Sequence, residues 1–179
     1  MTTKIEIRQL QTIDELKEMQ ALEKSVWNML PMPIHHTFTT LLNGGIILGA
    51  YDGKRMVGFL YSFAGFDGDS PYVCSHMLGI DEAYRQQGIG VKLKLQQAQI
   101  ARELGYKKIT WTFDPLESVN ANLNLNKLGA KGMVYSPNHY GEMEDRLNEG
   151  LPSDRIHIWW DVTEEAQEEE LPKFSKDKV

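Results

Sequence analysis

Hydrophobic residues recur along the chain with two alternating periods, one typical of helices and one typical of strands. Apolar residues at helical spacing predict helices at residues 13–27, 36–42, 88–104 and 118–128. Alternating or continuous apolar runs predict strands at residues 4–10, 46–51, 55–63, 72–80, 108–113, 133–135 and 155–162. The 179 residues suit one domain in which strands and helices interleave.

Two local signals fix the ends of predicted elements. Thr12 and Glu15 have the spacing of a capping box, in which a hydroxyl and a carboxylate cap the start of the first helix. Asp52-Gly53 lies between two strands, and this dipeptide tolerates the positive φ angles of a tight turn. The sequence therefore predicts a helix that follows Thr12 and a hairpin over residues 46–63.

Composition narrows the class of protein. Hydrophobic residues make up 41% of the chain and charged residues 25%, which is ordinary for a globular protein. No apolar stretch is long enough to span a bilayer, and we expect no export signal. Cys74 is the single cysteine, which excludes an internal disulfide and a zinc site with two thiolates. His35 and His36 are adjacent, so their side chains diverge by roughly 100° on a helix. We expect a cytoplasmic protein that binds neither a membrane nor a metal.

Charge is distributed unevenly along the chain. The formal net charge of −6 argues against general binding of nucleic acid through its phosphates. Residues 163–179 are rich in acids, and we expect them to form a flexible tail after a domain at residues 1–162. Between Arg85 and Lys108 the balance reverses in favour of basic residues. This local excess favours a small polyanionic ligand, although a solvated helix face explains it equally well.

A glycine-rich turn at residues 85–90 lies between a predicted strand and a long predicted helix. The first amide groups of a helix have no partner inside the helix and point along the positive end of its dipole. Gly88 and Gly90 would let a phosphate approach the backbone closely. The turn lacks the spacing of a nucleotide P-loop and the three-glycine Rossmann fingerprint. It indicates a phosphate site of another kind, although a Gly-x-Gly pair alone also serves to pack a strand against a helix.

Residues 85–90 read Arg-Gln-Gln-Gly-Ile-Gly, which resembles the Arg/Gln-x-x-Gly-x-Gly/Ala pyrophosphate loop of the GNAT superfamily, the acyl-CoA-dependent N-acyltransferases. Residues 78–85 resemble the lead-in to that loop, with a glutamate where the family has proline. Residues 121–130 resemble the second motif of the family, and the element order resembles the GNAT order over residues 4–162. Three stretches look like a poorly characterised bacterial GNAT subgroup: residues 111–116, 120–121 and 150–155.

The resemblance implies a fold and a co-substrate. The fold would be α/β (α+β), with a mixed, mostly antiparallel central sheet flanked by helices. The co-substrate would be acetyl-CoA or another acyl-CoA, without a metal. By resemblance, the loop amides, the preceding strand edge and the second motif would hold CoA through Leu78, Gly79, Ile80, Arg85, Gln86, Gln87, Gly88, Ile89, Gly90 and Asn120. Lys92 and Lys94 would add positive charge near the phosphates.

The resemblance also implies direct transfer from the thioester to a bound amine, which must first lose a proton. His76 is the candidate base, because its ordinary pKa of about 6.5 leaves it mostly neutral at cellular pH. GNAT members resembling serotonin N-acetyltransferase carry a histidine at the matching position. Strand alternation predicts that His76, Leu78 and Ile80 share one face with Cys74. Glu82 or water is the alternative base, and a half-buried structural histidine is the alternative interpretation of His76.

The residue that usually protonates the leaving thiolate is missing from this sequence. Many GNAT members have a tyrosine four residues before the glycine of the second motif, and this chain has Leu125 there. Tyr135 and Tyr140 are the candidate substitutes, although a tyrosine in a long loop more often serves packing or forms a pocket wall. Backbone amides near Leu78 would stabilise the oxyanion of the tetrahedral intermediate.

Two functions follow from these residues. The preferred one is an N-acyltransferase that moves an acetyl group from acetyl-CoA to a small-molecule or peptide amine within a ternary complex. The alternative is a catalytically silent GNAT module that binds acyl-CoA or an amine metabolite, which the missing tyrosine favours slightly. We expect residues 27–36 and 136–154 to shape a partly apolar acceptor pocket, and a homodimer is left open.

Overall fold

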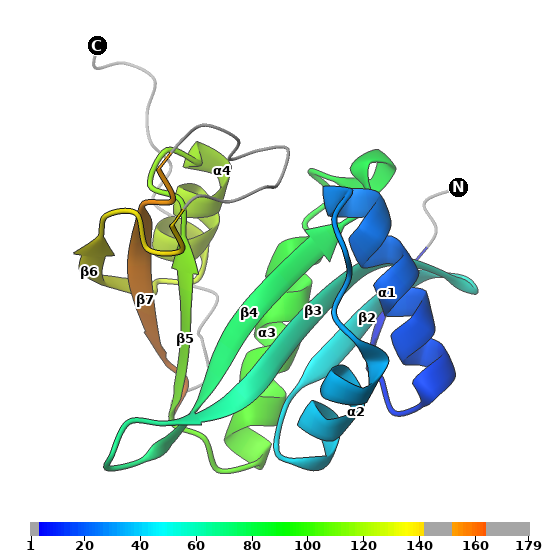
Figure 1. Cartoon of the computed structure of the whole chain (residues 1–179), viewed down its shortest axis with the longest axis horizontal. Helices are drawn as coiled ribbons and strands as arrows, with labels where there is room; N and C mark the ends of the chain where they lie inside the picture. The colour runs from blue at the N-terminus through cyan, green and yellow to red at the C-terminus, as the bar shows by residue number, and fades with distance from the viewer. Residues whose placement is uncertain (1–3, 142–151, 164–179) are drawn as a thin grey trace.

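The computed structural model of the chain describes residues 4–141 and 152–163 (Figure 1). Within that part, the chain forms one seven-stranded sheet with strand order β1-β2-β3-β4-β5-β7-β6. Only the β4–β5 pair is parallel, and the other neighbouring strands are antiparallel. The expected mixed, mostly antiparallel sheet is confirmed.

The first half of the chain builds four strands and two helices. In chain order these are β1 (Glu6–Gln9), α1 (Ile13–Trp27), α2 (Ile34–Leu42), β2 (Ile47–Asp52), β3 (Arg55–Phe66) and β4 (Pro71–Ile80). The Thr12 and Glu15 capping box is present at the start of α1, as expected. The β2–β3 hairpin is also confirmed, with Gly53 at φ +60° in its turn.

The second half begins at the glycine-rich loop. Its elements are the 3₁₀ helix η1 (Glu82–Tyr84), α3 (Ile89–Glu103), β5 (Lys108–Phe113), α4 (Ser118–Ala121), the π-helical turn η2 (Asn122–Lys127), β6 (Lys131–Ser136) and β7 (Arg155–Asp161). The helix expected over residues 118–128 is present over residues 118–127, but only its first part, α4, is an α-helix. Wider hydrogen bonds replace its second half, such as the Leu128 N–H to the Leu123 carbonyl oxygen at 3.0 Å.

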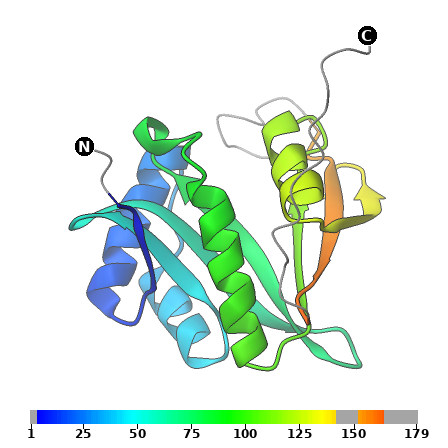
Figure 2. The ribbon, with the colours of Figure 1, turned by 180° about the vertical axis from the view of Figure 1, so that it is seen from behind.

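Helices cover both faces of the sheet. α1 and α2 lie on one face, and α3 and α4 lie on the other (Figures 1 and 2). Two hydrophobic clusters correspond to these layers: Leu93 and Ala98 of α3 pack in one, and Leu16 and Met19 of α1 pack in the other. No helix in residues 4–141 and 152–163 is long and apolar enough to cross a membrane. The acidic tail predicted after residue 162 falls almost wholly outside the described residues.

β4 and β5 are paired over a short distance only. Val73 lies opposite Ile109 and Cys74 lies opposite Thr110, and beyond these pairs the two strands diverge (Figure 1). The β5-facing edge of β4 after Cys74 therefore has no strand partner within the part of the chain that the structure describes. An unpaired edge offers backbone N–H and C=O groups to a ligand that can add as a strand.

A β-bulge interrupts the middle of β4. Tyr61 of β3 lies opposite Met77 while Ser62 lies opposite Ser75, so His76 is an extra residue in β4. The His76 ring lies near the rings of Tyr61 and Phe63, on the face covered by α1 and α2. Leu78 and Ile80 instead pack in the cluster beneath α3. The expected shared face of His76, Leu78 and Ile80 is therefore wrong, because the bulge reverses the alternation.

Candidate functional site

The loop between β4 and α3 carries backbone amides that are free to bind an anion. Gln86 has a φ of +64° and Gly88 a φ of +75°, and left-handed residues in a turn make successive N–H groups converge. No described residue accepts a hydrogen bond from the backbone N–H groups of residues 86–90. The N-terminus of α3, which begins at Ile89, adds the positive end of its dipole.

The tip of the β2–β3 hairpin holds this loop in place. The Tyr84 hydroxyl donates a hydrogen bond to Asp52 Oδ2 at 2.7 Å. Arg55 Nη2 forms an ion pair with Asp81 Oδ2 at 2.7 Å. The other oxygen of Asp81 accepts the Ala83 N–H at 3.0 Å and caps η1. These contacts hold residues 81–84, which lead into the loop, against the hairpin.

Gly90 faces the space beside the free edge of β4. A methyl group added to its Cα would lie 3.5 Å from Leu78 Cδ2 and 3.9 Å from Leu123 Cδ2. Gly90 therefore points between β4 and η2, where the arm of a ligand anchored in the loop would pass. Larger side chains at this position would enter that path.

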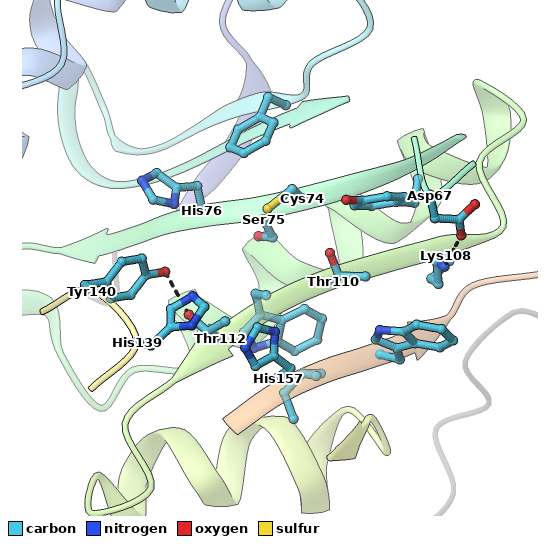
Figure 3. Close-up of a pocket in the computed structure, with 15 residues that line it drawn as sticks. Asp67, Cys74, Ser75, His76, Lys108, Thr110, Thr112, His139, Tyr140 and His157 are labelled. Atoms are coloured by element: carbon cyan, nitrogen blue, oxygen red, sulfur yellow. Dashed lines mark hydrogen bonds and ion pairs between the residues drawn. The ribbon is translucent and has the colours of Figure 1, made fainter. Parts of the chain in front are cut away.

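A cleft of about 430 Å³ opens where β4 and β5 separate (Figure 3). β4 contributes Cys74, Ser75 and His76. β4 also contributes Tyr72. The remaining walls come from β3, β5, β7 and the segment after β6, and they include Phe63, Thr110, Trp111, Thr112, His139, Tyr140, His157 and Trp159. Most of these side chains are rings, so the cleft suits a flat or apolar group better than a highly charged one.

The charged residues of the cleft are largely neutralised. Lys108 Nζ lies 2.7 Å from Asp67 Oδ2, and it also lies 4.0 Å from the centroid of the Trp159 ring. Asp67 is the one carboxylate among the described residues that line the cleft. An acceptor with several positive charges would therefore find no unpaired carboxylate on these walls.

His76 lies at the surface of the cleft with a lowered pKa. Partial removal of the ring from water is the main cause of this lowered pKa, and the charge of His36 contributes further. The ring lies 5.9 Å from the Phe63 ring and 6.4 Å from the Tyr61 ring, between centroids. A lowered pKa keeps the imidazole neutral near pH 7, the form that can accept a proton.

Other predicted site residues lie apart from the cleft lining. Glu82 is exposed in η1 beside the phosphate loop, and Asn120 is exposed on α4. Tyr135 is exposed on β6, and its hydroxyl donates to Asp154, which raises the pKa of Tyr135. Leu125 of η2 is 42% exposed. The structure brings His76 to the cleft but not Glu82 or Tyr135.

Lys94 does not lie near the phosphate loop. The structure buries this side chain to 3% exposure, and its Nζ donates a hydrogen bond to Ser75 Oγ at 2.9 Å. The ammonium also lies 3.7 Å from the centroid of the Trp111 ring. The expected contact between Lys94 and the phosphates is therefore wrong, because Lys94 points into the core face of α3. Lys92 remains exposed.

Several cleft residues had only weak signals in the sequence. Alternation in β7 indicates that Trp159 and Trp160 face opposite ways, and Trp160 is indeed buried while Trp159 lines the cleft. The same alternation places His157 beside Trp159. Ser75 had no signal in the sequence, because its place in the cleft depends on the separation of β4 and β5. His139 falls within residues 136–154, which were expected to shape the acceptor pocket.

Comparisons with known proteins give the same assignment as the loop motif. The sequence model of the acetyltransferase (GNAT) family matches residues 10–129. No curated protein matches the sequence. Ribosomal-protein-S18-alanine N-acetyltransferase from Escherichia coli is similar in structure over 93% of this chain and 99% of that chain, with a TM-score of 0.72 and 13% sequence identity.

Two further solved structures share the fold. N-acetyltransferase from Staphylococcus aureus Mu50 has a TM-score of 0.71 and 16% identity, over 89% of this chain and 99% of that chain. NAA60 from Arabidopsis thaliana in complex with acetyl-CoA has a TM-score of 0.69 and 11% identity, over 88% and 99%. Such low identities show the fold alone, whereas the family match covers more than half of the sequence. The chain belongs to the GNAT acetyltransferase family.

Proposed function

We propose that this protein transfers an acetyl group from acetyl-CoA to an amine by direct attack within a ternary complex. The observation that carries the proposal is the row of free amides at residues 86–90, which opens toward the unpaired edge of β4. A pyrophosphate in the loop and an extended arm along that edge would together fit these groups. Arabidopsis NAA60, which shares the fold, has been solved with acetyl-CoA.

The strand edge would orient the arm of acetyl-CoA. After Cys74, the β5-facing backbone groups of β4 have no strand partner among the described residues, so they are available to the amides of the arm. The carbonyl oxygen of Ile80, at the end of the strand, accepts a hydrogen bond from Arg85 Nε at 3.4 Å. The same edge supplies N–H groups that would stabilise negative charge on the thioester oxygen as the amine attacks. These groups are held by the sheet and need no rearrangement during the reaction.

His76 is our candidate for the proton acceptor. An alkylamine has a pKa near that of lysine, about 10.4, so it must lose a proton before it can attack. The His76 ring lines the cleft on the face covered by α1 and α2, and its lowered pKa favours the neutral form. We therefore assign the acceptor to this side of the sheet and acetyl-CoA to the side of α3.

The acceptor would be an amine whose remaining part is apolar or aromatic. Rings from β3, β4, β5 and β7 form most of the cleft, and its carboxylate Asp67 is already paired with Lys108. Both a small molecule and the end of a peptide meet this description. NAA60 and Naa50 from Arabidopsis thaliana, which share the fold, have been solved with bisubstrate analogues.

Thiol release over a panel of amines tests this function against simple binding. The panel should hold aromatic, aliphatic and polycationic amines together with short peptides. We expect acetyl-CoA to raise the melting temperature and thiol to be released with at least one apolar or aromatic amine. A raised melting temperature without thiol release on any amine would instead support a binding module. Two features favour that second function. Leu125 stands where many GNAT members have a tyrosine, and the hydroxyl of Tyr135 is already hydrogen-bonded to Asp154.

A further inference from the structure

Lys94 is a buried cation with no anionic partner in the described residues. It lies on the inner face of α3, and no carboxylate there comes within ion-pair distance of its Nζ. Burial lowers the pKa of Lys94 to about 7. Transfer of a charged amine from water to such a site is costly, and a buried lysine of this kind is more typical of chemistry than of packing.

Lys94 is linked to the cleft by one hydrogen bond, to Ser75. Its Nζ donates to Ser75 Oγ at 2.9 Å, and the Trp111 ring covers it at 3.7 Å. Cys74 is the titratable group whose charge acts on Lys94, and it raises the lysine pKa slightly against the larger effect of burial. Strands β1, β2 and β3, together with the residue before β1, contribute apolar side chains to the cluster that α3 also packs in, namely Ile5, Ile7, Leu48, Ala50, Val57 and Leu60.

Ser75 connects this lysine to the cleft. It follows Cys74, the last residue of β4 that pairs with β5, so it lies where the two strands begin to separate. Ser75 is only 5% exposed but it lines the cleft together with Trp111 (Figure 3). The adjacent His76 projects from the opposite face of the same strand. The two candidate proton-transfer groups therefore flank the opening from its two sides.

The reach of CoA brings its sulfur close to this position. The arm from pyrophosphate to sulfur has a backbone of about twelve atoms, as many as four peptide residues, and extends roughly 14 Å. The stretch of β4 from Ile80 back to Ser75 measures about 17 Å at roughly 3.3 Å a residue. An arm anchored at the loop would thus end near the middle of β4, within a few ångströms of the level of Ser75.

We propose that Ser75 donates a proton to the departing CoA thiolate and that Lys94 resupplies it. This proposal rests on the proposed function. It assigns the proton donor for the leaving thiolate, a role for which that function names no residue. The Lys94 Nζ hydrogen points at Ser75 Oγ, which leaves the serine hydrogen free to point into the opening. Ser75 touches the leaving group, and Lys94 is a positioning residue that acts through it.

Protons and electrons balance in the proposed step. As the amine nitrogen forms its bond to the acyl carbon, the carbon–sulfur bond breaks and its electron pair stays on sulfur. Ser75 Oγ passes its hydrogen to sulfur and takes one from Lys94 Nζ. The amine gives its proton to His76, which releases it to solvent. After CoA leaves, solvent returns a proton to the neutral lysine through Ser75. An ammonium with a pKa near 7 is a stronger acid than a thiol with a pKa near 8.5, so the transfer is downhill.

A binding measurement tests the sulfur contact without turnover. Calorimetry at pH 8 would compare CoA with desulfo-CoA, which lacks the thiol, on the wild type, Lys94→Met and Ser75→Ala. We expect CoA to bind the wild type at least threefold more tightly than desulfo-CoA, and both variants to lose that difference. Gln97→Leu is the matched control. Gln97 is buried one turn along the same face of α3, its side-chain amide has no partner among the described residues, and the variant should keep the difference.

Kinetics provide the second readout. With an accepted amine, Lys94→Met and Ser75→Ala should each lower kcat at least tenfold, with KM for acetyl-CoA changed less than threefold. The double variant should be no slower than either single one, because the two groups act in series. Wild-type kcat should fall as pH rises above neutrality, and this fall should be missing in Lys94→Met.

The outcomes separate this proposal from the proposed function. The relay would be overturned if the ratio of CoA affinity to desulfo-CoA affinity were the same in all four proteins, or if kcat were normal in both variants. Acetyl transfer by the wild type would still stand in either case. A wild type that binds neither CoA nor desulfo-CoA would overturn the function and the relay together.

Discussion

Two residues on β4 and α3, His76 and Lys94, carry lowered pKa values for related reasons. Lys94 is buried and His76 is partly removed from water near the point where β4 and β5 separate. Removal from water disfavours the charged form of a base. Their pKa values make His76 neutral and Lys94 partly protonated near pH 7. A pair of groups in these forms suits a reaction that takes a proton from an amine and returns one to sulfur.

The buried lysine predicts a dependence of stability on pH. The pKa of Lys94 falls from 10.5 in the unfolded chain to about 7 in the native protein. Between these values the unfolded state binds a proton that the native state lacks, so stability should rise with pH by about 1.4 kcal/mol per pH unit. Urea unfolding of the wild type and Lys94→Met from pH 7 to 9.5 measures this slope. A slope that is the same in both proteins would contradict the lowered pKa.

His76→Gln tests the candidate base. The substitution should lower kcat by roughly 10²-fold or more, the usual contribution of a general base. The acidic limb of the pH profile, below about pH 6.5, should also disappear, while acetyl-CoA affinity stays the same. His35→Gln, on α2 and outside this cleft, is the control. A His76→Gln enzyme with near-normal kcat and the original pH profile would transfer the role to Glu82 or to water.

At the scale of elements, the sequence predicted what neighbouring residues decide. The capping box at Thr12 and the turn at Gly53 are both local, and both are present. The bulge at His76 could not be predicted, because it arises from how β4 pairs with β3 over Tyr61 and Ser62. The π-helical turn η2 could not be predicted either, because the spacing of its apolar residues also fits an ordinary α-helix.

The phosphate loop gives a prediction in which two glycines differ. Gly88 has a φ of +75°, so Gly88→Ala should destabilise the protein by roughly 1–2 kcal/mol. Gly90 has room for a methyl group, so Gly90→Ala should fold normally. Gly90→Val should fold as well but weaken acetyl-CoA binding at least tenfold, about 1.4 kcal/mol. Calorimetry and thermal unfolding measure both effects. Unchanged affinity in a folded Gly90→Val protein would defeat the assignment of the loop.

At the scale of the whole molecule, the separation of β4 and β5 creates the site. It leaves an edge of β4 without a strand partner and opens a cleft beside it, and in the proposed function these take acetyl-CoA and the amine (Figure 1). The sequence predicted the strands and the loop motif, but the separation depends on long-range packing of α3, β5 and η2. His139 and Tyr140 fall within residues 136–154, which were expected to shape the acceptor pocket, and both line the cleft. Their exact positions could not be predicted, because they follow β6 in an irregular segment.

The ring-lined cleft predicts how the acceptor is selected. Trp159→Ala removes an exposed ring from the wall and should raise KM for an aromatic amine about fivefold or more, with KM for acetyl-CoA unchanged. Trp159 belongs to β7, far along the chain from the loop motif, so its effect reports on the assembled site. Steady-state kinetics with matched aromatic and aliphatic amines check this. An equal rise in KM for acetyl-CoA would show that the ring serves the other substrate.

Acetyl transfer itself is tested most directly by product stoichiometry. The protein would be incubated with acetyl-CoA and an amine that stimulates thiol release, and mass spectrometry would quantify the acetylated amine beside free CoA. We predict one acetylated amine for each CoA released, and no CoA release above background when the amine is left out. CoA release without acetylated amine would mean that water is the acceptor and would contradict the proposed transfer.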